Sequence, residues 1–334
     1  MTLPPRPTGR LRVVIDTDAA NEIDDQFAIA WALLAPDLLE VVGIHAAPFC
    51  HGHYFRRLTE AARSRGGERT PMEDLASLFT AEQHRDMIER NPPAMGEQRS
   101  RHEIHRVLAA MDLDDPPPVV AGSGRFMESP DDLVESDAAH RLVELAADAS
   151  PIDPLYVVVI GAPTNVAASL LVDPTIAERI VVIFVAGYPS GTPHVDESFN
   201  LVQDRHATNV VLAHATHLLY QPGYQVAEVL GYSLADSERW LRGHGRLGDF
   251  LHELYVANPI DRNVARPGRA WVMWDILPVA WLLDPAWSPT FETPRAQITP
   301  HHTWEAAPGT MTEAYRARRN DIFGDFVTRL HAAE

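Results

Sequence analysis

Short runs of almost entirely apolar residues alternate along the chain with segments whose apolar residues recur at helical spacing. The runs "LRVVI" at 11–15, "LYVVVIGA" at 155–162 and "RIVVIFVA" at 179–186 are rich in β-branched residues. Helical patterns such as "DDQFAIAWALLA" at 24–35 lie between such runs. Strands this uniformly apolar are buried on both faces, which is typical of parallel sheets covered by helices. The pattern predicts an α/β fold with a mostly parallel, doubly wound sheet.

The length and apolar content of the chain are consistent with one large core. The 334 residues are 46% hydrophobic, so we expect a single domain over residues 1–334. The alternating pattern lapses between about residues 66 and 101, where the sequence is polar and broken by prolines. We expect a loop or helical excursion near the mouth of an active site there, although a plain surface insertion would give the same pattern. Residues 233–258 have a helical pattern, and residues 311–333 predict a terminal amphipathic helix.

Charge and composition exclude several classes of function. The formal net charge of -18 argues against nucleic acid or an anionic membrane as the partner, so we expect a small-molecule ligand. The chain has no lysine, which excludes Schiff-base chemistry and a phosphate-loop lysine, and a single cysteine, Cys50, excludes an internal disulfide or a thiolate metal cluster. The polar, proline-rich start and the lack of a long apolar run lead us to expect a cytoplasmic protein.

The first predicted strand leads into an unusually acidic segment, "DTDAANEIDD", with four aspartates and one glutamate. Asp16 and Asp18 fall at the carboxyl end of the strand, where open α/β sheets bind their ligands. Helix capping would explain Asp24 and Asp25, which open the next helix. Capping would not explain Asp16 and Asp18, which stand at the end of a buried strand, where an uncompensated charge costs several kcal/mol. A calcium or magnesium ion would remove this conflict, because both prefer carboxylate oxygens.

Two familiar metal loops can be compared with this spacing. An EF-hand loop that began at Asp16 would require glycine and glutamate where Asn21 and Phe27 stand, so it does not fit. The haloacid-dehalogenase-type phosphatases also begin with a strand and Asp-x-Asp, and "VVIDTD" resembles them. They usually carry threonine or valine where Ala20 stands, and they commonly use a lysine. A phosphatase remains an alternative.

The opening is more similar to that of the inosine-uridine type nucleoside hydrolases, which begin with a strand, Asp-x-Asp, a short loop and Asp-Asp. The loop "AANEI" is two residues longer than their common form. The likeness continues in order through "PVVAGS", "IGAPTNVAASLLVDP", "ESFNLVQDRHA" and "WDILPVAWLLDP", and so covers most of the chain. It implies a calcium-dependent hydrolase, a homodimer or homotetramer, that cleaves the N-glycosidic bond of a ribonucleoside or modified nucleoside to give free base and ribose.

The resemblance also implies roles for individual residues. Asp18 would be the general base that takes a proton from a water held by the ion, and Asp24 and Asn200 would bind ribose hydroxyls. Asp16 would support the ligands without binding the metal. The implied ligands of one Ca²⁺ per chain are Asp18, Asp25, the backbone carbonyl of Thr164 and Asp275. Two of these residues also fit a purely structural role, because Thr164 could simply start a helix and Asp275 could be a helix N-cap.

The sequence departs from the family pattern at three places. The usual glycine-asparagine after the second strand is replaced within "APFCHGH", which leaves Cys50 or His51 near that position. The usual Glu-Phe-Asn becomes "ESFN", so that Glu197, a candidate substrate-binding residue, is displaced by one position and Ser198 stands in its place. The histidine that many members carry before the last metal-binding aspartate is Trp274 here.

Because of these departures, the sequence does not identify the group that assists the departing base. Trp274 could stack on the base or could be one more packed aromatic residue. His51 and His194 are candidate acids, although a single histidine is more often a surface or packing residue. A relative that binds a ribosyl ligand without cleaving it is also consistent with these changes. Retention of all four opening aspartates and Asp275 favours catalysis.

Overall fold

The computed structural model describes residues 3–258, 260 and 268–333. The strands are β1 (Leu11–Thr17), β2 (Leu39–Ala46), β3 (Val119–Val120), β4 (Leu155–Val159), β5 (Ile180–Val185), β6 (His217–Gln221), β7 (Gly231–Ser233), β8 (Ala270–Val272), β9 (Thr290–Ile298) and β10 (Trp304–Ala314). The helices are α1 (Asp24–Leu33), α2 (His51–Arg65), α3 (Pro71–Ser77), α4 (Ala81–Arg90), α5 (Pro93–Met111), α6 (Asp137–Ala147), α7 (Thr164–Val172), α8 (Phe199–Val202), α9 (Arg205–His214), α10 (Leu234–Trp240), α11 (Gly245–Val256), α12 (Ile276–Leu283) and α13 (Arg319–Ala332), with short 3₁₀ turns at Pro174–Glu178, Ala227–Val229 and Pro285–Trp287.

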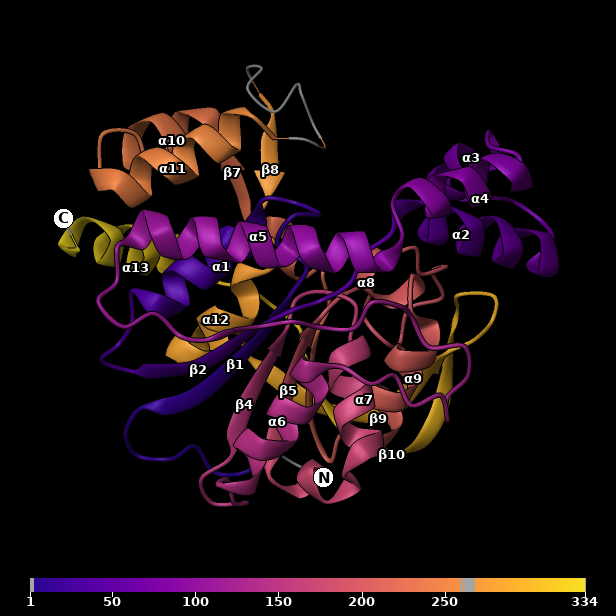
Figure 1. Cartoon of the computed structure of the whole chain (residues 1–334), viewed down its shortest axis with the longest axis horizontal. Helices are drawn as coiled ribbons and strands as arrows, with labels where there is room; N and C mark the ends of the chain where they lie inside the picture. The colour runs from indigo at the N-terminus through magenta and orange to yellow at the C-terminus, as the bar shows by residue number, and fades with distance from the viewer. Residues whose placement is uncertain (1–2, 259, 261–267, 334) are drawn as a thin grey trace.

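An eight-stranded sheet in the order β3-β2-β1-β4-β5-β6-β10-β9 forms the centre of the molecule (Figure 1). Its strands pair in parallel from β3 through β10, and β9 runs antiparallel to β10 at one edge. Strands β7 and β8 form a separate small antiparallel pair. The prediction of a single α/β domain with a mostly parallel, doubly wound sheet is confirmed.

Alternate residues of the central strands enter two separate cores, as the pleat of a sheet covered on both faces requires. One core lies between the sheet and α1, α5, α12 and α13, and the other lies between the sheet and α6, α7 and α9. Strand β5 contributes Val181, Ile183 and Val185 to the first core and Ile180, Val182 and Phe184 to the second. The helices therefore hold the sheet from both sides, and the carboxyl ends of its strands form one rigid edge.

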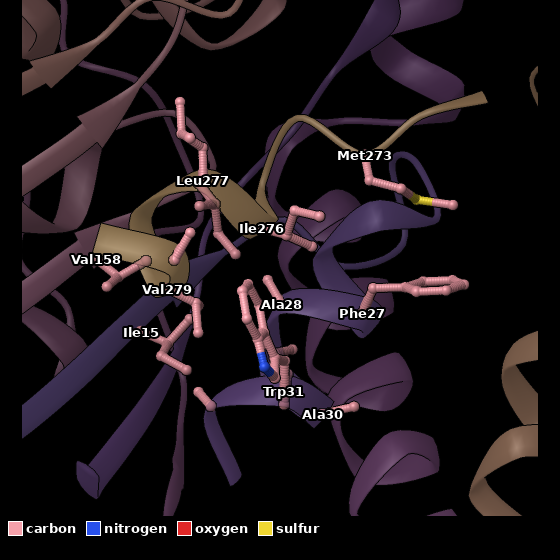
Figure 2. Close-up of a cluster of buried hydrophobic side chains, with 14 of the residues drawn as sticks. Ile15, Phe27, Ala28, Ala30, Trp31, Val158, Met273, Ile276, Leu277 and Val279 are labelled. Atoms are coloured by element: carbon pink, nitrogen blue, oxygen red, sulfur yellow. The ribbon is translucent and has the colours of Figure 1, made fainter. Parts of the chain in front are cut away.

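Helices α1 and α12 pack against each other over β1 and β4 (Figure 2). Ala28 and Trp31 of α1 lie in the same buried cluster as Ile276 and Val279 of α12. Every residue of α12 is buried, so this short helix is fixed on all sides. Because the two helices pack together near their beginnings, the acidic residues at these two N-termini are held close to each other.

The segment 66–101 comprises the connection that follows α2, the helices α3 and α4, and the first half of α5. Helices α2, α3 and α4 gather beside the N-terminal end of α5 (Figure 1). Thr70 and Thr80 each start a helix with a complete capping box, which explains why this polar sequence still forms helices. Gly96 allows α5 to lie directly against the backbone of Phe49, because a Cβ at this position would lie 2.1 Å from the Phe49 carbonyl oxygen.

Two sequence expectations differ from the structure in detail. The terminal helix begins at Arg319 and not at residue 311, because residues 311–314 complete β10, where they pair with β6 and β9. The helical stretch expected over 233–258 is divided into α10 and α11 by a turn that contains Gly243 at a φ of 79°. Among the described residues, no helix combines the length and apolarity that a membrane span needs.

The close contact between Gly96 of α5 and the backbone of Phe49, just before α2, can be tested by substitution. Gly96→Ala should lower the free energy of unfolding by about 1–3 kcal/mol, because the added methyl group overlaps the backbone of Phe49. Gly324→Ala in α13 is the matched control, since nothing lies within 4 Å of its Cβ position and alanine favours a helix. Chemical denaturation should show the loss only for Gly96→Ala; equal stability of the two variants would contradict this packing.

Candidate active site

A cavity of about 820 Å³ opens at the carboxyl ends of the central strands. The strand order reverses between β1 and β4, and ligands of open α/β sheets bind at such a switch point. The walls of the cavity come from the β1–α1 loop, α2, α3, the segments after β4, β5 and β6, α8, and the segment from β8 into α12. The lining residues used below are Asp18, Glu22, Asp24, Asp25, His51, Tyr54, Met72, Leu75, Glu197, Asn200, Tyr224, Trp274 and Asp275.

The floor of this cavity carries a cluster of buried carboxylates. Asp24 and Asp25 of α1 and Asp275, which precedes α12, each place one carboxylate oxygen within 4.8 Å of the others. Asp18 follows β1 and is also buried beside them, and its pKa is raised well above the usual value by burial and then by the charge of Asp25. Residues separated by about 250 positions in the sequence thus share one acidic site.

Helix capping does not account for these carboxylates. The N-cap position of α1 is Ile23, and Asp275 occupies the N-cap position of α12, yet neither side chain makes a capping hydrogen bond to the described residues. The backbone N–H of Asp275 instead donates to Asp24 Oδ2 over 3.1 Å, and the hydroxyl of Thr17 donates to Asp25 Oδ1. The positive ends of two helix dipoles meet at the cluster and partly offset its charge.

Burial makes the ionised state of this cluster expensive. Burial raises the pKa of Asp24 to about 6, and burial together with the charge of Asp24 raises the pKa of Asp25 to about 8. Burial and neighbouring aspartates raise the pKa of Asp275 well above its usual range. The protein by itself therefore does not neutralise these charges.

A divalent cation fits this donor set. Asp18 Oδ2 and Asp24 Oδ1 are enclosed and have no hydrogen-bond partner among the described residues. Unpaired buried carboxylate oxygens are costly unless a proton or a cation completes them. The donors are all hard oxygen atoms, which favours calcium or magnesium over softer metals.

Asp16 and Thr164 lie behind the described lining of the cavity. Asp16 accepts a hydrogen bond from Asn165 Nδ2 over 2.9 Å, and burial raises its pKa to about 7. Asn165 also bonds the carbonyl of Ala46, so it links the ends of β1 and β2 to the start of α7. The hydroxyl of Thr164 donates to Asp204 Oδ2 over 2.7 Å. This buried network fixes the strand ends that carry the cluster.

The segment at the start of α8 carries the other polar candidates. Asn200 lines the cavity and donates from Nδ2 to the carbonyl of Ile160 over 3.0 Å, which fixes the orientation of its side chain. Glu197 also lines the cavity, and its Oε2 accepts a hydrogen bond from the hydroxyl of Thr70. Thr70 caps α3, so Glu197 joins the cavity wall to the excursion that the sequence placed near the mouth.

Trp274 forms part of an aromatic wall. Its ring lies edge-on to Tyr224, with 5.5 Å between centroids and 71° between planes. Tyr224 stacks on Tyr188, and Tyr188 stacks on His194 with centroids 4.7 Å apart. Trp274 and Tyr224 line the cavity, whereas His194 lies outside its described lining. Of the two histidines proposed as acids, only His51 reaches the cavity, and burial lowers its pKa from the ordinary value.

Residues 13–321 match the sequence profile of the inosine-uridine preferring nucleoside hydrolases. The chain belongs to this family. Solved structures of similar fold include a purine-preferring ribonucleoside hydrolase from Gardnerella vaginalis (16% identity, TM-score 0.63, 96% of this chain and 98% of the other covered). An inosine-guanosine nucleoside hydrolase (15%, 0.65, 96% and 98%) and an inosine-uridine preferring nucleoside hydrolase from Bacillus anthracis (14%, 0.59, 97% and 100%) are also similar. A search of curated proteins finds no match.

As a nucleoside hydrolase, the chain is an N-glycosyl hydrolase, and its cavity contains further residues to which the sequence analysis gave no role. Tyr54 and Tyr224 line the aromatic side, and Met72 and Leu75 come from α3. These positions carry no local signal, because they reach the cavity only through tertiary packing: Tyr54, Met72 and Leu75 on α2 and α3, and Tyr224 in the segment after β6. Glu22 had a signal, since it is the glutamate of the acidic opening segment, and it also lines the cavity.

The raised carboxylate pKa values predict a linked dependence on pH and calcium. Between about pH 4 and pH 8 the folded protein binds more protons than the unfolded chain, so in a chelator its stability should fall as pH rises. A divalent cation bound by these carboxylates would displace those protons, so any stabilising effect of added calcium should be larger at pH 8 than at pH 5. At about 100 times the dissociation constant, the ion should add about 2.7 kcal/mol to the free energy of unfolding.

Thermal melts at both pH values, with chelator or calcium, measure this effect. Asp25→Asn is the control variant, because it removes one charge of the cluster with little change in volume. It should melt at a higher temperature than the wild type at pH 8 in chelator and should lose most of the calcium shift. If neither chelator nor calcium changes the melting temperature of the wild type, the result would contradict a metal site.

Proposed function

We propose that this chain is a calcium-dependent nucleoside hydrolase that cleaves the N-glycosidic bond of ribonucleosides and favours purine bases. The proposal depends above all on the buried cluster of Asp24, Asp25 and Asp275 at the switch point of the sheet, with Asp18 beside it. The cavity above the cluster has an aromatic side that contains Trp274. Such a cavity suits a ligand with a polar sugar at one end and a flat base at the other.

Hydrolysis requires a water that attacks the anomeric carbon of the sugar while the bond to the base breaks. In this proposal Asp18 accepts the proton of this water, and the role is supported by its Oδ2, which has no hydrogen-bond donor among the described residues. A calcium ion held by Asp18, Asp25, Asp275 and the carbonyl of Thr164 would lower the pKa of that water and orient the ribose hydroxyls. The surrounding carboxylates stabilise the positive charge that develops on the ring.

The sugar and the base have separate binding surfaces in this proposal. Asp24, Asn200 and Glu197 provide polar groups for the sugar, and Asp16 supports the site through Asn165. Trp274 provides a flat surface for the base. His51 is less suited to protonate the base near neutral pH, because burial lowers its pKa and so disfavours the imidazolium.

A release assay tests the function and separates its alternatives. Purine and pyrimidine nucleosides and nucleotides are incubated with the protein, and reducing sugar, free base and phosphate are measured. Ribose and base without phosphate are expected. Phosphate release would support the phosphatase alternative, and binding without any product would support a silent ribosyl-binding relative. The family match already weakens the phosphatase, which rested on Asp16 and Asp18 alone.

Asp18→Asn should reduce turnover by about a thousandfold or more, because it removes the proton acceptor and weakens a metal ligand at once. Asp24→Ala should mainly raise KM and lower kcat/KM through lost sugar contacts. Circular dichroism and thermal melting check that both variants fold. Turnover by Asp18→Asn close to that of the wild type would contradict the mechanism.

Trp274→Ala should lower the rate on purine nucleosides about ten- to hundredfold, the effect of roughly 1–3 kcal/mol from one stacked base. The ratio of purine to pyrimidine turnover should fall with it. Trp240→Ala in α10, outside the described lining of the cavity, is the control for losing a tryptophan and should leave the ratio unchanged. An unchanged ratio in Trp274→Ala would assign Trp274 to packing alone.

The homodimer or homotetramer expected from the sequence stays a prediction, as does the cytoplasmic location. Analytical ultracentrifugation measures the first, and fractionation of cells that express the protein measures the second.

A further inference from the structure

The loop between Asp18 and Asp24, which is two residues longer than the common family form, has a defined conformation. The backbone N–H of Asn21 donates to the carbonyl of Asp18 over 2.7 Å, and Gln26 Nε2 donates to the carbonyl of Ala19 over 2.6 Å. Ile23 is buried in the core, with 1% of its surface exposed. The backbone of the intervening Glu22 is therefore held at both sides and is not a free surface residue.

The side chain of Glu22 enters the cavity. Its Oε2 is enclosed and has no hydrogen-bond partner among the described residues. Burial chiefly raises the pKa of Asp18 and Asp275, and of Tyr54 and Tyr224 across the cavity, and the nearby charge of Glu22 adds to each of these shifts. The carboxylate thus lines the same cavity as the acidic cluster and the two tyrosines, and is near enough to affect both.

Glu22 is not among the three carboxylates, Asp24, Asp25 and Asp275, that place oxygens within 4.8 Å of one another. A ribose in the cavity would present hydroxyl groups to Glu22, and a carboxyl group in either protonation state keeps an oxygen that accepts from a hydroxyl. Asp18 Oδ2 and Asp24 Oδ1 are also enclosed and have no hydrogen-bond partner among the described residues. With Asp18 assigned to the attacking water in the proposed function, the carboxylates of Glu22 and Asp24 remain for the two hydroxyl groups of a vicinal diol.

We propose that Glu22 is a sugar-binding and specificity-determining residue, whose carboxylate accepts a hydrogen bond from the ribose 2′- or 3′-hydroxyl beside the hydroxyl bound by Asp24. This inference rests on the proposed function and assigns to the longer loop a selection for ribonucleosides over deoxyribonucleosides. A site that leaves a buried acceptor unpaired when a hydroxyl is missing rejects the deoxy substrate strongly.

The test compares the wild type with Glu22→Gln on inosine, with 2′-deoxyinosine and 3′-deoxyinosine as competitive inhibitors. For inosine, kcat/KM should fall about five- to tenfold, because Glu22→Gln keeps an acceptor oxygen but replaces a charge-assisted hydrogen bond by a neutral one of about half the strength. The inhibition constant of the deoxy analogue that lacks the hydroxyl bound by Glu22 should be unchanged by the substitution. The other analogue should bind more weakly to the variant, as inosine does. Glu22→Asp keeps the charge, but its shorter side chain moves the carboxylate away from the ribose. This variant should show the same selective loss.

Two controls separate this role from others. Glu89→Gln on α4, an exposed glutamate outside the described lining of the cavity, should change none of these constants. Calorimetric titration of calcium should show only a small loss of affinity for Glu22→Gln, from the missing nearby charge, whereas Asp25→Asn should lose most of it. Equal weakening of inosine and both analogues, no weakening at all, or a matching loss of calcium affinity would each overturn the proposal. Failure of the wild type to hydrolyse any nucleoside would instead contradict the proposed function, and the inference with it.

Discussion

Buried carboxylates crowd together at the end of β1, and the packing around them has to oppose their mutual repulsion. Asp24, Asp25 and Asp275 are held together although burial and mutual charge oppose their ionisation. The packing of α1 on α12 holds them, through a core that includes Trp31 and Ile276 (Figure 2). A hydrophobic core of this kind can oppose several kcal/mol of local repulsion, because each large buried side chain contributes about 1.5–3 kcal/mol. The fold thus keeps a cation site assembled before a cation binds.

The features that the sequence predicted well are those set by local pattern. Uniformly apolar strands predicted a sheet covered on both faces, and the residues of β5 do alternate between two cores. The position of Asp18 and Asp24 followed from where the first strand ends and the next helix begins. That Asp275 joins them from the far end of the chain could not come from periodicity. It came from the order of the family motifs, and the structure adds the packing that explains it.

The features that the sequence missed depend on contacts between distant segments. Residues 311–314 have a helical pattern on their own, but pairing with both β6 and β9 provides backbone hydrogen bonds that a helix at this place would not make with the sheet. His194 lies in a loop after β5, where a polar side chain could face the cavity, yet its stacking on Tyr188 places it outside the described lining. Glu22 was visible as one acid among five, but only the enclosed, unpaired Oε2 distinguishes it from a solvated loop residue.

The two ends of the cavity are built from different kinds of structure, and this difference bears on specificity. The acidic end is formed where strands and helices meet in the core, so its geometry is fixed by the same packing that stabilises the fold. The aromatic and apolar end comes from α2, α3 and connecting segments, including Met72, Leu75 and Tyr224. Such segments tolerate substitution and insertion far better than strand ends do. Trp274, which stands where many family members carry histidine, and Glu22 of the longer loop both line the cavity beside the acidic cluster. Under the proposed function, a change in the choice of base or sugar at these two positions need not disturb the carboxylates that would activate water.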